Sequence, residues 1–388
     1  PGRIEAEVPL PDHGSMLRRA SRPLSRAASR RRLYATAPPL PEWETLGFNA
    51  TPTARMIRYN WSAERGWDAG ESSPEFTVTI HGLSNVLHYG QGLFEGLKAF
   101  HCKDGLVRVF NSHANAARLQ SGAERLAMPV VPPELFDEAV DRCIRDNVEY
   151  VPPYGYGGAM YLRPFLFGHG EKLGLGAAPH YSFCVIASPV GAYYKGGLEP
   201  IDALVVEGFD RAAPRGVGNI KAAGNYAPDV LPSILAKEKG YPVCLYLDAA
   251  TQTYVEEFST SNFIGVTAEG TVVTPTSPSI LPSCTKGVVL ETARRLGMRV
   301  EERPVSFDEV GGLKEVAACG TAVVLTPISS VTRGGTVHSY AGFDTIATLY
   351  NAITSVQQGE ANDALGITRV VAERPHDPPC RDAEAAAA

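Results

Sequence analysis

The sequence predicts an α+β protein rather than a regular alternation of strands and helices. The chain has 388 residues, of which 44% are hydrophobic and 20% are charged. This composition is typical of globular proteins, and the length suffices for about two to three domains. Strand-like runs follow one another with few helix-like segments between them. A doubly wound sheet needs a helix after nearly every strand, so an α+β fold is favoured.

Residues 46–190 are predicted to contain short strands and two helices. Strand-like runs occupy 76–80, 106–110 and 181–187. The first helix is expected to begin at Asn111 or Ser112 and to end before Pro129. Its apolar residues recur at helical spacing, and they are Ala116, Leu119, Ala123 and Leu126. The second helix follows a pair of prolines and has one apolar face, formed by Phe136, Val140, Cys143, Ile144 and Val148.

A glycine-rich stretch, 191–200, is predicted to connect this region to a second one, 201–371. The elements expected in the second region are strands at 201–207 and 243–248, a hairpin over 263–274 that turns at Glu269-Gly270, and helices at 228–239 and 286–296. Each of these two helices is followed by a glycine, a common helix-ending residue. The tail, 372–388, contains several prolines and is expected to be disordered.

The first 40 residues differ in composition from the rest. From His13 to Pro41 there is no acidic residue, whereas arginine occurs at positions 18, 19, 22, 26, 30, 31 and 32. An Arg-rich, Ser-rich and acid-poor segment is typical of a mitochondrial transit peptide. Residues 1–40 therefore predict targeting to the mitochondrial matrix, with Met16 as a candidate initiator. A disordered basic tail or a nucleic-acid-binding arm has a similar composition, and a cytoplasmic location is expected if the segment is no signal.

Charge and composition argue against several classes of protein. Thirty-six Lys and Arg against 42 Asp and Glu give a net charge of −6, so we expect no nucleic acid as the main partner. No apolar run approaches the roughly 18 to 20 residues that span a bilayer, so we expect no membrane association. The seven cysteines are widely spaced without a C-x-x-C pair, which indicates reduced thiols. The nine histidines lack zinc-site spacing, so we expect no metal.

A single lysine is embedded in the segment from Gly216 to Tyr226, between small and polar residues. Lys221 has no charged neighbour within this segment. A confined lysine has its ammonium form disfavoured, which makes the amine a better nucleophile toward an aldehyde. A surface lysine in a flexible glycine loop is the alternative interpretation. A phosphate loop does not fit, because Lys221 is neither preceded by glycine nor followed by Ser or Thr.

Three other segments have residues suited to a site. Glu256-Glu257 precedes a hydroxyl cluster, and a buried carboxylate can hold a proton on a pyridine nitrogen; a solvated turn is the alternative. Ser283-Cys284-Thr285 opens a predicted helix whose free N–H groups can bind phosphate, although it can also be a plain N-cap. Gly320-Thr321 ends a predicted strand in a similar way and is no more specific by itself.

Six segments occur together in an order that resembles the branched-chain amino-acid aminotransferases. They are His88-Tyr-Gly-Gln-Gly-Leu-Phe-Glu-Gly-Leu-Lys-Ala-Phe100, Tyr161-Leu-Arg-Pro164, Ser188-Pro-Val-Gly-Ala-Tyr193, Gly218-Asn-Ile-Lys-Ala-Ala-Gly-Asn-Tyr226, Ile280-Leu-Pro282 and Gly320-Thr-Ala322. The resemblance covers about residues 53–371, and 349–357 is similar to the family's last helix. It implies a fold-type IV pyridoxal-phosphate enzyme with a smaller N-terminal α/β domain and a larger C-terminal pseudo-barrel domain. A homodimer is expected.

The resemblance also implies roles for individual residues. Lys221 resembles the catalytic Schiff-base lysine, and Glu257 resembles the carboxylate that faces the pyridine nitrogen of pyridoxal 5′-phosphate. Tyr226 is similar to the tyrosine that binds the cofactor's phenolic oxygen. The phosphate is expected to contact Arg118, Thr260, Cys284, Thr285 and Thr321. The expected substrate-binding residues are Tyr89, Phe94, Tyr161, Arg163, Tyr193, Thr321 and Ala322, with Tyr89 reaching the neighbouring subunit's site.

The implied reaction is reversible transamination of L-leucine, L-isoleucine and L-valine with 2-oxoglutarate, which gives branched-chain 2-oxo acids and L-glutamate. An apolar pocket discriminates by only about 1 to 3 kcal/mol per methylene, so all three substrates are expected. The stretch from Phe258 to Asn262 departs from the Gly-Thr-Met-Asn of many relatives. The alternatives are therefore a diverged aminotransferase of secondary metabolism and, less favoured, a fold-type IV lyase.

Overall fold

The computed structural model describes residues 37–191 and 198–374. Most of the predicted transit segment, most of the connection at 191–200 and the tail beyond Arg374 lie outside these ranges. Tyr193, one of the expected substrate-binding residues, also lies outside the described residues.

The first sheet is antiparallel and has nine strands in the order β18-β6-β5-β7-β8-β1-β2, with β3 on β1 and β4 on β7. Its strands are β1 (Met56–Ser62), β2 (Gly66–Trp67), β3 (Glu71–Ser73), β4 (Gly92–Phe94), β5 (Leu97–His101), β6 (Leu106–Phe110), β7 (Ala159–His169), β8 (His180–Val190) and β18 (Thr368–Glu373). Its longest pairing is the β7–β8 hairpin. Short β4 lies beside β7 and carries Phe94, whose partner there is Phe165.

The second sheet contains a closed ring of six strands, β11-β10-β9-β16-β15-β12, because β12 also pairs with β11. The whole second sheet has nine strands, which are β9 (Ile201–Val205), β10 (Val243–Leu247), β11 (Val255–Phe258), β12 (Ser261–Val266), β13 (Val272–Thr274), β14 (Val300–Glu302), β15 (Glu315–Gly320), β16 (Val324–Arg333) and β17 (Thr336–Ser339). Parallel neighbours of β9 on both sides mix with antiparallel pairs. Closure of the ring removes two exposed edges that open strands would present.

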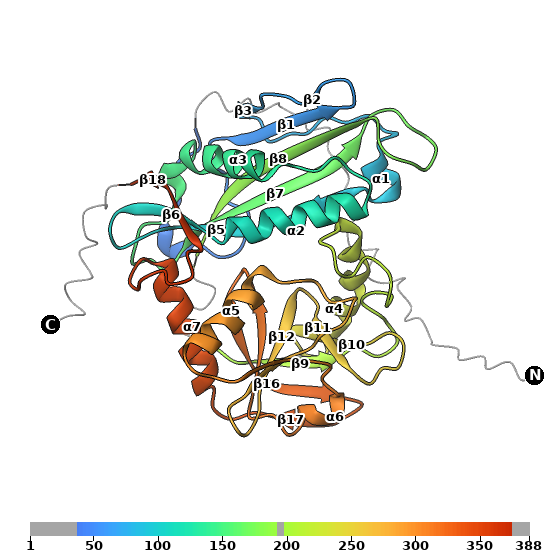
Figure 1. Ribbon diagram of the computed structural model, residues 1–388, viewed down its shortest axis with the longest axis vertical. Coiled ribbons are helices and arrows are strands. Elements are labelled where there is room, and N and C mark those ends of the chain that lie inside the picture. The colour runs from blue at the N-terminus through green and yellow to red at the C-terminus, as the bar shows by residue number, and fades with distance from the viewer. Residues whose placement is uncertain (1–36, 192–197, 375–388) are drawn as a thin grey trace, which may run out of the picture. The chain divides into compact units, whose positions relative to one another are not determined.

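Helices flank both sheets (Figure 1). They are α1 (Asn85–Tyr89), α2 (Ser112–Arg125), α3 (Pro133–Arg145), α4 (Val230–Glu238), α5 (Cys284–Arg295), α6 (Phe307–Val310) and α7 (Asp344–Gln357). Helix α3 buries Phe136 against Phe183 of β8, with ring centroids 5.9 Å apart. Helices α5 and α7 cover β15 and β16 of the second sheet.

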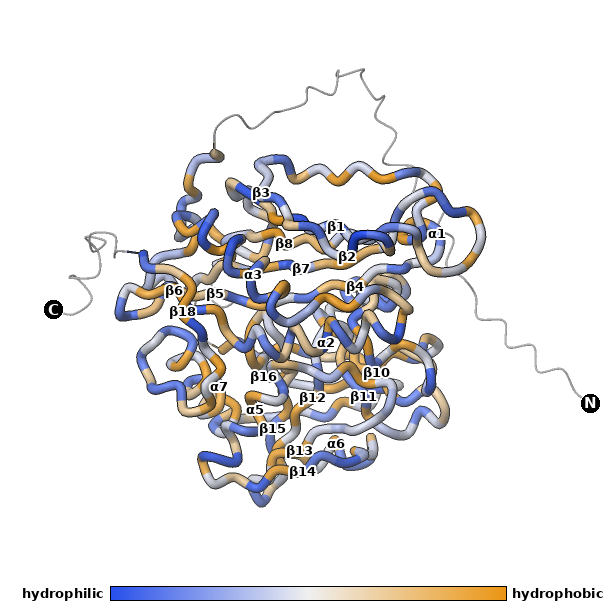
Figure 2. The backbone as a smooth tube through the Cα atoms, turned by 45° about the horizontal axis from the view of Figure 1, so that its top comes forward, coloured by the Kyte–Doolittle hydropathy of each residue, from blue (hydrophilic) through white to orange (hydrophobic). Residues whose placement is uncertain are grey.

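A shared hydrophobic core joins the two sheets. Phe100 and Phe110 of the first sheet belong to the same buried cluster as Val289 of α5 and Leu325 of β16. Figure 2 shows hydrophobic residues along the strands of both sheets and hydrophilic residues in many peripheral loops. This common core holds the two sheets' strand ends at fixed positions, which a site assembled from both requires.

Most predicted elements are confirmed, with two corrections. The predicted strand at 76–80 forms no strand, because Val78 and Ile80 pack on Met56, Phe167 and Cys184 instead of pairing at a sheet edge. The second correction concerns β18, which the sequence placed partly in the second region and partly in the tail. It returns after α7 to pair with β6 of the first sheet. Alternation within a strand does not specify its partner.

Among residues 37–191 and 198–374, no helix has the length and apolar character needed to cross a membrane. In the same ranges, no cluster of three or more His, Cys, Asp or Glu side chains could hold a metal ion.

Candidate active site

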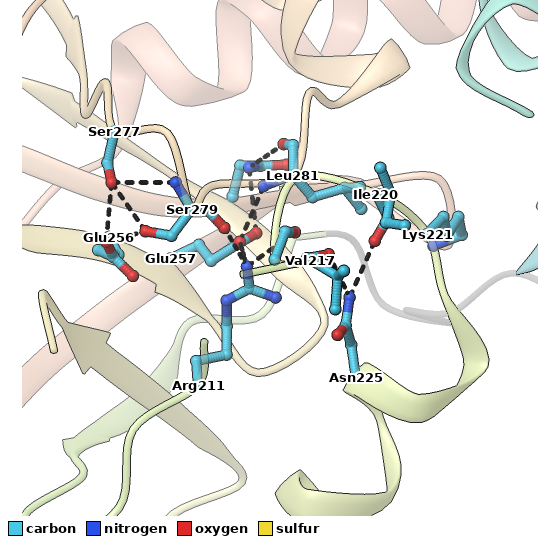
Figure 3. Close-up of polar contacts among 12 residues, drawn as sticks. Arg211, Val217, Ile220, Lys221, Asn225, Glu256, Glu257, Ser277, Ser279 and Leu281 are labelled. Atoms are coloured by element: carbon cyan, nitrogen blue, oxygen red, sulfur yellow. Dashed lines mark hydrogen bonds and ion pairs between the residues drawn. The ribbon is translucent and has the colours of Figure 1, made fainter. Parts of the chain in front are cut away.

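The segment that carries Lys221 is fixed from two sides. The N–H of Phe94 in β4 donates to the Lys221 carbonyl at 3.2 Å, and Leu93 forms a β-bridge with Ala222. On the other side, Asn225 Nδ2 donates to the carbonyls of Val217 and Ile220 at 2.8 and 2.9 Å (Figure 3). The backbone therefore presents Lys221 in one orientation, which excludes the flexible-loop alternative.

The Lys221 amine lies among aromatic rings. Its Nζ donates to the Tyr226 hydroxyl at 2.9 Å and lies 4.7 Å from the centroid of Phe94. Phe94 meets Tyr226 edge-on at 4.8 Å. Burial, with Arg118 acting in the same direction, lowers the pKa of Lys221 to about 8. Burial raises the pKa of Tyr226 to about 12, so the tyrosine stays protonated while the lysine titrates.

The uptake of an aldehyde by the apoprotein is expected to follow the titration of Lys221. Only the neutral amine attacks a carbonyl, so the uptake rate of pyridoxal phosphate should rise about tenfold per pH unit below pH 8 and level off above it. Stopped-flow absorbance against pH measures this. Burial also lowers the pKa of Lys98 to about 8, so the Lys98→Met variant is the matched control. A profile whose inflection near pH 8 disappears in that control would assign it to Lys98 instead.

Arg118 of α2 is held by a carboxylate that the sequence did not single out. Glu95 is fully buried, and its two oxygens accept Arg118 Nε at 2.8 Å and Nη2 at 2.7 Å. Asn115 Nδ2 donates to Glu95 at 2.7 Å, and Arg118 Nη1 donates to the Pro282 carbonyl at 3.0 Å. Burial opposes the charge, but Glu95 raises the pKa of Arg118 above its usual value. Three of the five guanidinium N–H groups are engaged in this way, so two remain for an anion.

Glu95→Gln is expected to lower the free energy of unfolding by about 3–5 kcal/mol, because it leaves the Arg118 charge buried without its partner. Urea unfolding of the apoprotein measures this. The matched control is Asp104→Asn, which breaks a bidentate pair with Arg108 near the surface (2.6 and 2.7 Å). Such an exposed pair contributes about 1 kcal/mol or less. Equal losses of unfolding free energy in the two variants would contradict the conclusion that Glu95 compensates the buried charge of Arg118.

Three of the five expected phosphate contacts line one cavity, and Arg118 lines a second hollow that shares Cys284 with the first. Cys284 and Thr285 of α5 line the first cavity together with Thr321, and Ser283 caps the helix through the Lys286 N–H at 3.0 Å. The first N–H groups of α5 and its dipole favour an anion there. Burial raises the pKa of Cys284 to about 11, so it remains a thiol. Thr260 lies exposed in the turn between β11 and β12 and is not among the residues that line this cavity.

Asn111 has a different role from the expected cap. It lies at the N-cap of α2 in the left-handed conformation (φ 56°), but its side chain makes no capping bond. Instead, Asn111 Nδ2 donates to the Cys284 carbonyl at 3.1 Å. The first residue of α5 is thereby tied to the start of α2, which holds the two helices that flank the cavity.

Glu257 is buried in β11 and faces a guanidinium (Figure 3). Arg211 Nη2 lies 2.6 Å from Glu257 Oε1 and donates to the Gly218 carbonyl at 3.0 Å, which links the carboxylate to the Lys221 segment. The Leu281 N–H donates to Glu257 at 3.0 Å. Burial raises the pKa of Glu257 to about 7, although Arg211 opposes that shift. Glu257 is therefore no solvated turn residue, and it can share a proton with a basic nitrogen.

The expected substrate-binding residues divide into two groups. Tyr161 and Arg163 lie with Phe94: Arg163 donates to the Tyr161 hydroxyl at 3.0 Å, and its guanidinium carbon is 4.8 Å from the Phe94 centroid. Phe48, which no motif indicated, meets Tyr161 edge-on at 5.3 Å. Tyr89 is exposed at the end of α1 and donates to the Leu173 carbonyl, and no contact among residues 37–191 and 198–374 brings it to Lys221.

The turn at Thr321-Ala322 joins the two sheets. Thr321 Oγ1 donates to the Gly96 carbonyl at 3.3 Å, and Lys98 Nζ donates to the Ala322 carbonyl at 2.6 Å. Gly96 lies between β4 and β5 and Lys98 lies in β5, whereas Thr321 and Ala322 lie between β15 and β16. Lys98 is a further buried cation that the sequence analysis missed.

These groups suit a phosphorylated pyridine aldehyde. A partly neutral lysine matches the aldehyde, and the spare N–H groups of Arg118 with the start of α5 match a phosphate. Glu257, buried and easily protonated, matches a pyridine nitrogen. Each of the three has its own polar partner: Tyr226 for Lys221, Arg211 for Glu257 and Glu95 for Arg118. The donor set thus fits pyridoxal 5′-phosphate on chemical grounds.

Comparison with known proteins agrees with this chemistry. The sequence profile for class IV amino-transferases matches residues 92–331. The branched-chain-amino-acid aminotransferase of Haemophilus influenzae is 42% identical over 329 residues, which are 82% of this chain and 95% of that protein. Transaminase AMT5 of Alternaria alternata is 39% identical over 354 residues, covering 88% of this chain and 95% of that protein.

Solved structures share the fold. The branched-chain amino acid aminotransferase from Escherichia coli superposes with a TM-score of 0.66 and 27% identity, covering 82% of this chain and all 100% of that chain. The expected α+β fold of fold-type IV is confirmed, with an antiparallel sheet in the first part of the chain and a closed six-strand ring in the second. The chain therefore belongs to the class IV aminotransferases, which use pyridoxal 5′-phosphate, and within them to the branched-chain aminotransferase family.

Proposed function

We propose that this enzyme transfers the amino group of L-leucine, L-isoleucine and L-valine to 2-oxoglutarate. The observation that carries the proposal is the aromatic wall beside the reactive amine: Phe94 lies 4.7 Å from Lys221 Nζ, and Tyr161 and Phe48 continue the wall. An apolar surface next to the amine suits a branched hydrocarbon side chain better than a polar one. The names of the bacterial and plant relatives support the same substrates.

The side chains divide the work of the reaction. The cofactor supplies an aldehyde that takes up the amino group and a ring that accepts an electron pair. Lys221 binds that aldehyde and, once released, moves the proton from the substrate α-carbon. The Tyr226 hydroxyl accepts from the Lys221 amine at 2.9 Å, and Glu257 would hold a proton on the ring nitrogen. Arg118 and the start of α5 bind the phosphate and fix the orientation.

The substrate carboxylate has its own donors. The N–H groups of Thr321 and Ala322 lie in a turn that Lys98 holds through the Ala322 carbonyl at 2.6 Å. Arg163 Nε is buried and makes no hydrogen bond in the described part of the chain. Beside Phe94, this N–H is available to a carboxylate of the amino acid or of 2-oxoglutarate. One apolar wall and one cationic group thus allow a pocket to accept leucine and glutamate in turn.

A substrate panel tests the proposal. Purified protein with pyridoxal phosphate and 2-oxoglutarate is supplied with leucine, isoleucine, valine, methionine, phenylalanine or alanine, and glutamate formation is followed. We expect the three branched substrates to give the highest kcat/KM. The Lys221→Ala variant, prepared in parallel, measures any contaminating transaminase. Turnover of none of the branched substrates by an enzyme that retains its cofactor would overturn the proposal.

A second candidate substrate class has specific support. Two fungal relatives, AMT5 of Alternaria alternata and htyB of Aspergillus rugulosus, are named transaminases without mention of branched-chain amino acids. Each is 39% identical to this chain. The stretch Phe258-Ser-Thr-Ser-Asn262, in which Thr260 is exposed and both end residues are buried, departs from many branched-chain enzymes, which permits a different pocket floor. Higher activity on methionine or phenylalanine than on leucine in the same panel would favour this alternative.

We also propose a homodimer located in the mitochondrial matrix. Exposed apolar residues at α1 and in the loop after β7 support the dimer, because Leu87, Leu173 and Leu175 are 61%, 75% and 83% exposed and a hydrogen bond from Tyr89 ties the two segments together. Light scattering that gives the mass of one chain would contradict the dimer.

The basic segment at the N-terminus supports the mitochondrial location. A fluorescent fusion of residues 1–45 found in the cytosol would contradict that location.

A further inference from the structure

Next to Glu257, a second buried carboxylate has no role in the reaction described above. Glu256 is 4% exposed, although it carries an ionisable group on a strand whose four residues are all buried. It accepts hydrogen bonds from the Ser277 hydroxyl, at 2.8 Å, and from the Ser279 hydroxyl. Burial of a carboxylate is costly unless it is paired or hydrogen-bonded. The two serine hydroxyls therefore stabilise Glu256 in its buried position.

The serines connect Glu256 to the partners of Glu257 (Figure 3). Ser279 donates its hydroxyl to Glu256, and its carbonyl accepts from Arg211 Nη2, the same nitrogen that pairs with Glu257. Two residues further on, the Leu281 N–H donates to Glu257 at 3.0 Å. One short segment, 277–281, therefore contacts both carboxylates and the Arg211 guanidinium.

The charges in this group do not balance. Glu256 and Glu257 are two buried carboxylates, and within the described residues Arg211 is the one cation in ion-pair contact with either. Lys286 acts on Glu257 only from a longer distance, and its effect is weaker than that of Glu256. Burial raises the pKa of Glu257 first, Arg211 lowers it, and Glu256 raises it again. When both carboxylates are ionised, one negative charge is left over in this buried group.

We infer that Glu256 is a positioning residue that supplies the surplus negative charge which keeps a proton on the ring nitrogen facing Glu257. Arg211 neutralises one of the two carboxylates, and the protonated nitrogen of the bound cofactor neutralises the other. This inference rests on the proposed role of Glu257. Glu256 itself contacts Ser277 and Ser279 rather than the reacting atoms, and it acts through the field at Glu257 and through the position of segment 277–281.

The test compares two probes that differ at the ring nitrogen. Apoprotein is titrated with pyridoxal phosphate and with its 1-deaza analogue, in which a C–H replaces the nitrogen, and the ratio of the two dissociation constants is measured. In the Glu256→Gln variant the amide oxygen can still accept from the serines, but the charge is gone. We expect the preference for pyridoxal phosphate over the deaza analogue to fall about tenfold, a change of about 1.4 kcal/mol. The affinity for the deaza analogue itself should change less than about twofold, which is about 0.4 kcal/mol.

Two further variants make the outcomes distinguishable. Ser277→Ala removes one hydrogen bond to Glu256 without removing charge, and it should keep the wild-type ratio. Glu257→Gln should abolish most of the preference for the nitrogen-containing probe. If Glu257→Gln keeps the wild-type ratio, the proposed role of Glu257 fails and the inference fails with it. If Glu257→Gln loses the preference while Glu256→Gln keeps it, Glu256 is merely structural and only the inference is overturned.

Discussion

Lys221→Ala is expected to lower kcat/KM for leucine by at least roughly 10⁴-fold. The variant loses the group that binds the cofactor aldehyde and also the group that moves the α-proton, and proton transfer alone contributes roughly 10² to 10⁴-fold. The surroundings leave no substitute at that position, because the nearest hydroxyl, Tyr226, stays protonated with a pKa raised by burial to about 12. Initial rates of glutamate formation measure the loss.

Two observations separate a missing amine from a damaged fold. A small external amine added to Lys221→Ala should restore part of the activity, since it can occupy the space beside Phe94 and accept the same proton. Lys98→Met removes another buried lysine, whose Nζ lies 2.6 Å from the Ala322 carbonyl. We expect this control to keep the visible absorbance of lysine-bound cofactor. Wild-type turnover in Lys221→Ala would remove Lys221 from the mechanism.

Glu257→Gln is expected to lower kcat by roughly 10² to 10³-fold, the effect typical of one preorganised electrostatic group. It should also lower the free energy of unfolding by about 3–5 kcal/mol, because the buried Arg211 loses its carboxylate, 2.6 Å away. Steady-state kinetics and urea unfolding measure the two losses separately.

The double variant Glu257→Gln with Arg211→Met distinguishes stability from catalysis. Removal of both charges should recover much of the unfolding free energy, since an apolar side chain replaces a guanidinium whose Nε has no hydrogen-bond partner in the described part of the chain. The activity should stay low, because no carboxylate then faces the ring nitrogen. Recovery of activity together with stability would show that Glu257 acts only on the fold.

The residues predicted best from the sequence lie close together along the chain or start an element. Lys221 and Tyr226 are five positions apart, and their contact depends on one local turn held by Asn225. Cys284 and Thr285 begin a helix whose start is indicated by small residues and by Ser283 at the N-cap. Local spacing and capping chemistry suffice for such groups, and the family resemblance added the order of the segments.

The residues that were missed act through tertiary contacts. Arg211 meets Glu257 across 46 positions, and Lys98 meets the Ala322 carbonyl across 224. Glu95 lies in the segment 88–100 that resembles the family, but only the position of α2 beside β4 shows that it pairs with Arg118. Phe48 precedes every motif and reaches Tyr161 because the N-terminal segment returns to β8, where the Gly191 N–H donates to the Gly47 carbonyl. Periodicity contains none of this pairing information.

Thr260 and Tyr89 illustrate the limits of transfer by motif. Thr260 is exposed in the β11–β12 turn, outside the cavity that contains Thr285 and Thr321. The Tyr89 hydroxyl donates to the Leu173 carbonyl, and its expected contact with the neighbouring subunit's site is not tested by this contact. Both roles stay predictions.

A half-reaction tests the central claim most directly. The cofactor-loaded enzyme is mixed with leucine in the absence of any 2-oxo acid, and the visible absorbance of lysine-bound cofactor is followed. The account predicts that this band disappears with leucine, isoleucine, valine and glutamate, more slowly with alanine, and returns when 2-oxoglutarate is added. An enzyme whose band is present and is unchanged by the branched-chain amino acids would contradict it.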